Sequence, residues 1–175
     1  MAQGEDEVGH KMLTIVSGGQ TGVDRAALDA AIAAGLPYCG WCPKGGWAED
    51  YPHPPGVRTR YPGLQETPDS SPDQRTGWNV RDADALMVLA DERGIAASRG
   101  TARAMAHAHE RDKPHIVIDL ERAGAPKLAQ DFLRRRTAQA LCIAGPRESE
   151  SPGIYAEARE FLVVLLCDRP TGNDG

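Results

Sequence analysis

Short apolar segments that alternate with amphipathic segments constrain the fold of this chain more than any other feature of its sequence. The apolar segments show little polar alternation, as in strands of a parallel sheet that is covered on both faces. The expected strands are residues 12–17, 36–41, 85–90, 116–120 and 140–144, and the expected helices are residues 23–34, 74–83, 101–111, 126–136 and 154–167. This order predicts parallel βαβ units and therefore a doubly wound, mainly parallel α/β sheet.

A single domain is expected to account for the chain. With 175 residues, of which 41% are hydrophobic, the chain can bury one core but hardly two. The polar, acidic residues 1–11 predict a disordered leader, and the polar residues 168–175 predict a flexible tail. The folded domain is therefore expected to span residues 12–167.

The composition excludes several classes of function. A net charge of -5 and a pI near 5.5 provide no basic surface for a nucleic acid polymer. No run approaches the roughly 18 apolar residues that span a bilayer, and the polar N-terminal residues lack the pattern of a signal peptide. Four cysteines do not make a disulfide scaffold. We therefore expect a cytoplasmic protein with no membrane partner, no nucleic acid polymer as partner and no structural metal.

The first of three glycine-containing loops joins the first expected strand directly to the first helix. It reads SGGQTGVDR from Ser17 to Arg25. Glycines allow a close backbone approach to an anion, and the amides at the start of the helix attract negative charge. Thr21 offers a hydroxyl and Arg25 a charged fork. The loop matches neither GxGxxG nor a P-loop, and a tight turn with a helix cap is the alternative interpretation.

Two further loops are expected at the same edge of the sheet. Ser98-Arg99-Gly100-Thr101 precedes a helix, where its amides can bind an anion or Ser98 can act as a simple cap. The loop from Gly145 carries Arg147 and Glu148 and otherwise reads as an ordinary polar loop. Because ligands bind beyond the carboxyl ends of parallel strands, the three loops are expected to converge.

The segment between residues 42 and 71 is rich in proline, glycine and charge, and predicts a lid or a wall of the site. Lys44 is a candidate cation for the ligand, or else a solvated side chain. In the helix that follows, Arg75, Asn79 and Asp82 share one face, which can line the pocket or face solvent.

Cys39 and Cys42 form a CxxC pattern that suggests a redox dithiol. The sequence Pro43-Lys44-Gly45-Gly46 that follows disfavours the helix such a motif needs, and no second CxxC supports a zinc site. We therefore predict no redox or metal function for these cysteines. His107 and His109, two residues apart, cannot share a helical face and are expected to be packing or surface residues.

Four segments together resemble the molybdenum cofactor carrier protein family: SGGQTGVDRAALDAA, GWCPKG, QRTGWNVRDAD and AGPRESESPGIY. That family belongs to the Rossmann-like superfamily of the LOG, or lysine-decarboxylase-like, phosphoribohydrolases, and the resemblance runs from about Leu13 to Leu165. It implies a Rossmann-like, usually oligomeric protein that holds molybdenum cofactor, a pterin phosphate. By matching motifs, the implied phosphate site comprises Gly18, Gly19, Gln20, Thr21, Gly22 and Arg25, with Gly100 and Thr101 in the second phosphate loop.

The second loop departs from the LOG pattern PGGxGTxxE. Ser98 and Arg99 replace its glycines, and Ala104 stands where the pattern has its acidic residue. A LOG-type hydrolase needs that carboxylate at the ribosyl carbon, so its loss argues against the same reaction. Arg99 can instead add positive charge to the anion site.

The leading hypothesis is a protein that binds, carries or protects a phosphorylated small molecule, with molybdenum cofactor as the expected ligand and without obligatory turnover. The alternative is a nucleotide N-glycosidase or other hydrolase that uses Asp24, Asp82 or Glu148 as its carboxylate. A nucleotide-sensing module is a third hypothesis. The family also implies a homo-oligomer, a dimer or tetramer. The full set of expected ligand-binding residues is Gly18, Gly19, Gln20, Thr21, Gly22, Arg25, Lys44, Arg75, Asn79, Arg99, Gly100, Thr101, Gly145, Arg147 and Glu148.

Overall fold

The computed structural model describes residues 12–91 and 98–167. The expected leader (1–11), the expected tail (168–175) and most of the loop that precedes Ser98 (92–97) lie outside the described residues.

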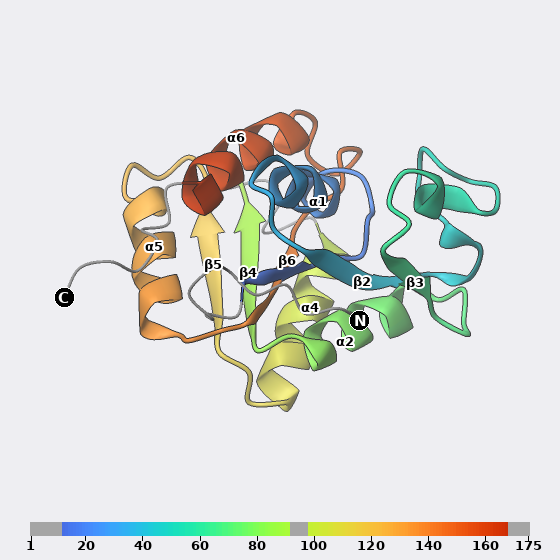
Figure 1. The fold of residues 1–175 in the computed structure, drawn as a ribbon, viewed down its shortest axis with the longest axis horizontal. Coiled ribbons are helices and arrows are strands. Elements are labelled where there is room, and N and C mark those ends of the chain that lie inside the picture. The colour runs from blue at the N-terminus through green and yellow to red at the C-terminus, as the bar shows by residue number, and fades with distance from the viewer. Residues whose placement is uncertain (1–11, 92–97, 168–175) are drawn as a thin grey trace.

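The described residues contain one parallel sheet, as the sequence predicted, and it has six strands, one more than the five expected (Figure 1). In spatial order the strands are β3 (Leu64–Glu66), β2 (Tyr38–Cys42), β1 (Thr14–Val16), β6 (Ala140–Ala144), β4 (Ala85–Ala90) and β5 (His115–Asp119). The last strand in the chain, β6, lies in the middle of the sheet and pairs with both β1 and β4. The segments that follow β1 and β6 therefore begin side by side.

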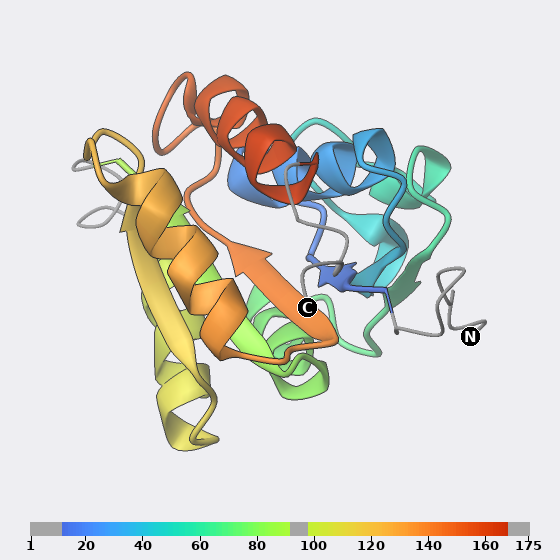
Figure 2. The ribbon, with the colours of Figure 1, turned by 60° about the vertical axis from the view of Figure 1, so that its left-hand side comes forward.

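Helices cover both faces of the sheet, which confirms a doubly wound α/β fold. One face carries α1 (Val23–Ala33), α5 (Ala125–Arg135) and α6 (Ile154–Cys167), and the other carries α2 (Pro72–Asp82) and α4 (Arg99–Glu110). Figure 1 shows α1 and α6 above the sheet and α2 and α4 below it, and the rotated view in Figure 2 separates the two layers.

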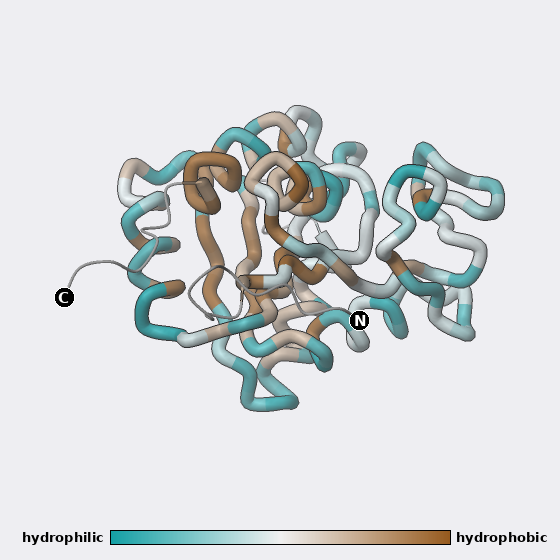
Figure 3. Tube along the Cα trace, viewed as in Figure 1, coloured by the Kyte–Doolittle hydropathy of each residue, from teal (hydrophilic) through white to brown (hydrophobic). Residues whose placement is uncertain are grey.

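Small residues set the packing on the first face. Ala26, Ala27, Ala30 and Ala31 of α1 are fully buried, so α1 packs closely against α6 and against the sheet. Leu162 and Leu165 of α6 belong to the same buried cluster as these alanines. In Figure 3 the strands and the inner sides of these helices carry the hydrophobic colour, while the outer loops are hydrophilic.

The second face has a smaller core that brings α2 and α4 together. Val16 and Val88 from the sheet contact Val80 of α2 and Ala104 of α4. Ala104, which stands at the acidic position of the LOG pattern, is therefore a buried packing residue.

The segment between β2 and α2 is ordered by its own small core rather than by long regular elements. It contains two short 3-10 helices, η1 (Lys44–Gly46) and η2 (Gly56–Thr59), and the strand β3. Val57, Tyr61 and Leu64 pack on Leu28 of α1 and on Cys42. β3 was not predicted, because three residues between Pro-Gly and Thr-Pro provide no strand pattern. None of the described helices is long and apolar enough to cross a membrane.

Candidate functional site

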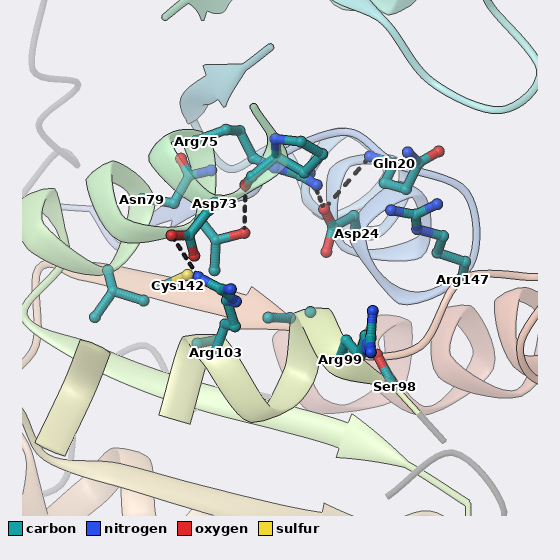
Figure 4. A pocket seen from close by; sticks show the side chains of 18 of the residues that line it. Gln20, Asp24, Asp73, Arg75, Asn79, Ser98, Arg99, Arg103, Cys142 and Arg147 are labelled. Atoms are coloured by element: carbon teal, nitrogen blue, oxygen red, sulfur yellow. Dashed lines mark hydrogen bonds and ion pairs between the residues drawn. The ribbon is translucent and has the colours of Figure 1, made fainter. Parts of the chain in front are cut away.

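A cavity of about 290 Å³ opens beyond the carboxyl ends of β1 and β6, between α2 and α4. All three glycine-containing loops contribute to its wall, so the expected convergence is confirmed. The lining residues named in Figure 4 are Gln20, Asp24, Asp73, Arg75, Asn79, Ser98, Arg99, Arg103, Cys142 and Arg147. Gly18, Gly100, Gly145 and Glu150 also line it.

A buried ion pair between α1 and α2 forms one wall of this pocket. The Nη1 of Arg75 lies 3.1 Å from the Oδ2 of Asp24, and both side chains are almost wholly buried. The backbone N–H of Gln20 donates to the same Asp24 oxygen at 3.4 Å. Burial raises the pKa of Asp24 above its ordinary value, although the nearby charge of Arg75 opposes that shift. Asp24 is therefore a largely buried carboxyl group surrounded by arginines.

Gly18 makes room for Arg75. A Cβ at residue 18 would lie 2.2 Å from the Arg75 Nη1 and 2.6 Å from its Cδ. Gly18 was expected to let a phosphate approach the backbone. In the structure a glycine is needed at this position because Arg75 packs over it. A second glycine of the loop, Gly22, adopts a positive φ of 76° and lies where a Cβ would come within 2.3 Å of the Pro146 oxygen. This close contact docks the third loop on the first.

The side chain of Gln20 has a fixed orientation. Its Oε1 accepts hydrogen bonds from the backbone N–H of Thr21 at 3.0 Å and of Glu49 at 2.9 Å. Its Nε2 is buried and has no hydrogen-bond partner among the described residues, and the same holds for the Nε of Arg75. The pocket wall therefore contains two buried donors without a hydrogen-bond partner among the described residues.

The opposite wall is the amino-terminal end of α4. The hydroxyl of Ser98 caps this helix by accepting from the Thr101 N–H at 3.2 Å and from the Thr101 hydroxyl at 2.9 Å. Arg99 and Gly100 form the first helical positions and line the pocket. Amides at these positions have no acceptor within the helix, so they favour an anion. Arg99 is exposed and forms no ion pair with any described residue.

Two further arginines line the cavity in different ways. Arg103 of α4 pairs with Asp73 of α2 at 2.5 Å and so joins the two helices across the pocket. The guanidinium of Arg147 lies over the ring of Trp47, 5.7 Å from its centroid, and 3.9 Å from a carboxylate oxygen of Glu49. Because the Glu49 contact is long, Arg147 keeps most of its capacity to bind an anion in the pocket.

Several expected ligand-binding residues contact the protein instead. Arg25 makes a bidentate ion pair with Asp50, at 2.8 and 2.9 Å, and contacts the Gly19 carbonyl oxygen. The Thr21 hydroxyl donates to Glu49. Arg25 and Thr21 were expected to bind an anionic ligand. In the structure they bind the carboxylates of Asp50 and Glu49. None of Gly19, Thr21, Gly22, Arg25, Lys44, Thr101 and Glu148 lines the pocket.

The remaining expected residues divide between the pocket and the scaffold. Lys44 lies exposed on η1. Glu148 accepts from the N–H groups of Gly153 and Tyr155 at the start of α6. Asn79 lines the pocket, but its amide is bonded in both directions to the backbone of Trp41, at 2.8 and 3.0 Å. Its evident role is to hold β2 against α2.

Sequence reasoning missed Asp73, Arg103 and Cys142 as pocket residues. Asp73 lies two residues before Arg75, where no helical spacing connects them. The pairing of Asp73 with Arg103 depends on how α2 and α4 lie side by side, which no local pattern reveals. A signal for Cys142 exists in retrospect, because it lies in the expected strand 140–144, whose end was expected to face the ligand.

All four cysteines are free thiols. Cys39 and Cys42 lie in β2, not at a helix start, and burial raises the pKa of both thiols. Burial also raises the pKa of Cys142, with a smaller contribution from the charge of Asp24. Within residues 12–91 and 98–167, no group of three or more His, Cys, Asp or Glu side chains can hold a metal ion.

Comparison with known proteins identifies the family. No curated protein matches the chain. A crystal structure from Syntrophus aciditrophicus, described as that of a "Putative molybdenum carrier protein", matches with 37% identity and a TM-score of 0.78, over 89% of this chain and 95% of that one. The family model of the circularly permutated YpsA SLOG family matches residues 15–166. Since that match spans nearly the whole described domain, the chain belongs to the circularly permutated YpsA SLOG family.

Proposed function

We propose that the protein binds and carries a phosphorylated small molecule in the pocket between α2 and α4. One observation carries the proposal: Arg99, Arg147 and the amino-terminal end of α4 meet in a single cavity in which Arg75 and Arg103 already have carboxylate partners. The two remaining arginines and the free amides attract an anion. A phosphate group fits this donor set because it offers several acceptor oxygens.

The volume of the cavity sets the size of the ligand. At about 290 Å³ it lies just below the range for small-molecule sites, which is roughly 300–1,000 Å³. The cavity can hold a nucleotide or pterin phosphate in part, and it is too small for a folded partner. This supports carriage of a small molecule.

Molybdenum cofactor is the cargo that the related protein's name favours. Its pterin phosphate offers an anion for Arg99 and Arg147. Cys142 lies in the pocket wall and is 3% exposed. Because Arg99, Arg147 and the amino-terminal end of α4 form a donor set for an anion, we propose that the pocket holds this cargo through its phosphate.

A hydrolase is the second candidate, and one observation favours a particular residue for it. Of the three carboxylates considered from the sequence, Asp24 lines the pocket, whereas Asp82 binds Arg81 and Trp41 at the surface and Glu148 caps α6. A buried carboxylate with a raised pKa can act as a general acid. If turnover occurs, Asp24 is its acid or base.

Thermal unfolding tests the proposal. The wild-type protein is compared with the variant Arg99→Ala/Arg147→Ala in the presence of inorganic phosphate, nucleoside monophosphates and anaerobically prepared molybdenum cofactor, and each sample is then analysed for products. The control is Arg134→Ala/Arg135→Ala, which removes the same charge from the exposed end of α5. We expect a ligand-dependent rise in Tm in the wild type and the control that is lost in the pocket variant.

The product analysis separates the two candidate functions. Stabilisation by a ligand that is recovered intact supports a carrier. Release of a free base and a sugar phosphate supports the hydrolase, and an Asp24→Asn variant that still released them would remove Asp24 from that role. If no ligand raises the Tm of the wild type, the proposed function is wrong.

We also propose, from the family, that the protein forms a homo-oligomer, a dimer or a tetramer. Sedimentation or light scattering gives the subunit number directly. A subunit number that changes when ligand is added would favour the nucleotide-sensing alternative.

A further inference from the structure

Two buried donors beside Asp24 have no acceptor in the part of the chain that the structure describes: the Gln20 Nε2 and the Arg75 Nε. Gln20 is 4% exposed and Arg75 is 7% exposed, so bulk water does not reach most of either side chain. Native proteins rarely leave buried donors without a partner. Both residues line the pocket, which suggests that a ligand supplies the missing acceptors.

The orientation of the Gln20 amide makes its Nε2 a dedicated donor. The Oε1 accepts from two backbone N–H groups, those of Thr21 and Glu49. A flipped amide would place the NH₂ group against these two donors and lose both hydrogen bonds. The two hydrogen bonds of Oε1 therefore fix the orientation of the amide and leave its Nε2 without a partner among the described residues.

Arg75 is equally constrained. One terminal nitrogen is bound to Asp24 at 3.1 Å, and the guanidinium packs against Gly18 so closely that no Cβ fits there. The charge of Arg75 is thus matched by Asp24. The Nε–H group of Arg75 remains without a partner among the described residues, whereas its positive charge is already paired. The second oxygen of Asp24, Oδ1, makes no hydrogen bond to any described residue and can accept from a hydroxyl or N–H group.

The two sides of the pocket differ in charge. Figure 4 shows Gln20, Asp24 and Arg75 on one side, with Arg147 beside Gln20 and Asp24, and Ser98 and Arg99 on the other side. On the first side the charges of Asp24 and Arg75 match each other, and Arg147 adds a positive charge at the edge. The second side combines the unpaired charge of Arg99 with the amino-terminal end of α4.

Resting on the proposed function, we propose that Gln20, Asp24 and Arg75 form a separate subsite that recognises a neutral polar head on the ligand. The head carries a carbonyl or hydroxyl oxygen for the two donors, while Arg99 and Arg147 bind the phosphate. The ligand class is therefore a phosphate monoester with a polar, hydrogen-bonding head, as opposed to inorganic phosphate or a monoester with an apolar head.

Titration calorimetry with four probes tests this subsite: inorganic phosphate, ribose 5-phosphate, adenosine monophosphate and guanosine monophosphate. The test variant is Gln20→Glu at pH 8, because glutamate keeps an oxygen for the Thr21 and Glu49 amides and replaces the NH₂ donor by an acceptor. The matched control is Gln65→Glu, the same change at an exposed position of β3. Arg75→Lys is the second test variant, since it keeps a charge beside Asp24 and removes the Nε donor.

We expect at least one monoester to bind the wild type ten times more tightly than inorganic phosphate does. This advantage, taken as a ratio of the two affinities, should fall below threefold in Gln20→Glu and in Arg75→Lys and should persist in Gln65→Glu. Circular dichroism checks the fold of each variant, and Arg75→Lys decides the outcome if Gln20→Glu does not fold.

Three other outcomes overturn the inference. The first is an affinity ratio that persists in both test variants. The second is inorganic phosphate binding as tightly as every monoester, which leaves the proposed anion site intact but removes the separate subsite. The third is a wild type that binds none of the probes, which removes the proposed function together with the subsite.

Discussion

Replacing Arg75 by methionine should leave Asp24 as a buried carboxyl without its cation. Arg75 is 7% exposed, so its pairing with Asp24 is only weakly screened by solvent. Removing one partner of a buried ion pair typically costs about 3–5 kcal/mol. At this chain length such a loss lowers Tm by roughly 6–20 °C, taking 2–4 °C per kcal/mol.

The cost should depend on pH, and its direction follows from Asp24. Burial already raises the pKa of Asp24 in the folded protein, and removing Arg75 raises it further. The folded state then holds a proton that the unfolded state releases, so stability falls as pH rises from the unfolded pKa, near 3.9, through the folded pKa of Asp24. Relative to the wild type, Arg75→Met should therefore lose little stability at pH 5 and the larger amount, about 3–5 kcal/mol, at pH 8.

Urea unfolding at these two pH values measures the effect. The variants Asp24→Asn and Asp24→Asn/Arg75→Met complete a double-mutant cycle. The double variant contains no buried charge at this pair and should be more stable at pH 8 than Arg75→Met alone. The reasoning is refuted if the loss of stability in Arg75→Met is the same at both pH values, or if Asp24→Asn does not restore part of it.

Three further predictions concern local packing and reactivity. Gly18→Ala should cost about 1–3 kcal/mol by overpacking against Arg75, and less in an Arg75→Met background; equal costs in both backgrounds, measured by urea unfolding, would show that Arg75 is not the obstacle. Ser98→Ala should lower stability by about 0.5–2 kcal/mol through loss of the α4 cap, whereas Ser98→Asp should retain most of it, as thermal unfolding can check. A disulfide reagent should label the exposed Cys167 rapidly and the buried Cys142 only at the rate of unfolding, and rapid labelling of Cys142 in native protein would contradict its burial.

The fold could be predicted because its strands and helices carry local signals. The strands 85–90 and 140–144 and the helix 154–167 have the predicted bounds in the structure. The other predicted elements differ by one or two residues at one or both ends, where caps and fraying blur the pattern. β3 has no such signal, because its three residues gain their strand conformation from pairing with β2.

The site could be predicted only in part, because partners from distant segments decide which residues are free. The sequence places Arg25 in a loop that suits an anion, yet Asp50, 25 residues away in a segment with no regular pattern, binds it. Arg75 was predicted from helical spacing, and its side chain does line the pocket. Its partner Asp24 lies 51 residues away, so the pair depends on how α1 and α2 meet.

Backbone amide shifts in an NMR titration test the central claim most directly, because they show where a ligand binds. The wild-type protein is titrated with the tightest-binding phosphate monoester, or with inorganic phosphate if none is tighter. The account predicts that the largest shifts occur at Gly18, Arg99, Gly100 and Arg147, which surround the cavity between α2 and α4. Shifts centred instead on Arg25, Lys44 and Asp50, with none at the amino-terminal end of α4, would contradict it.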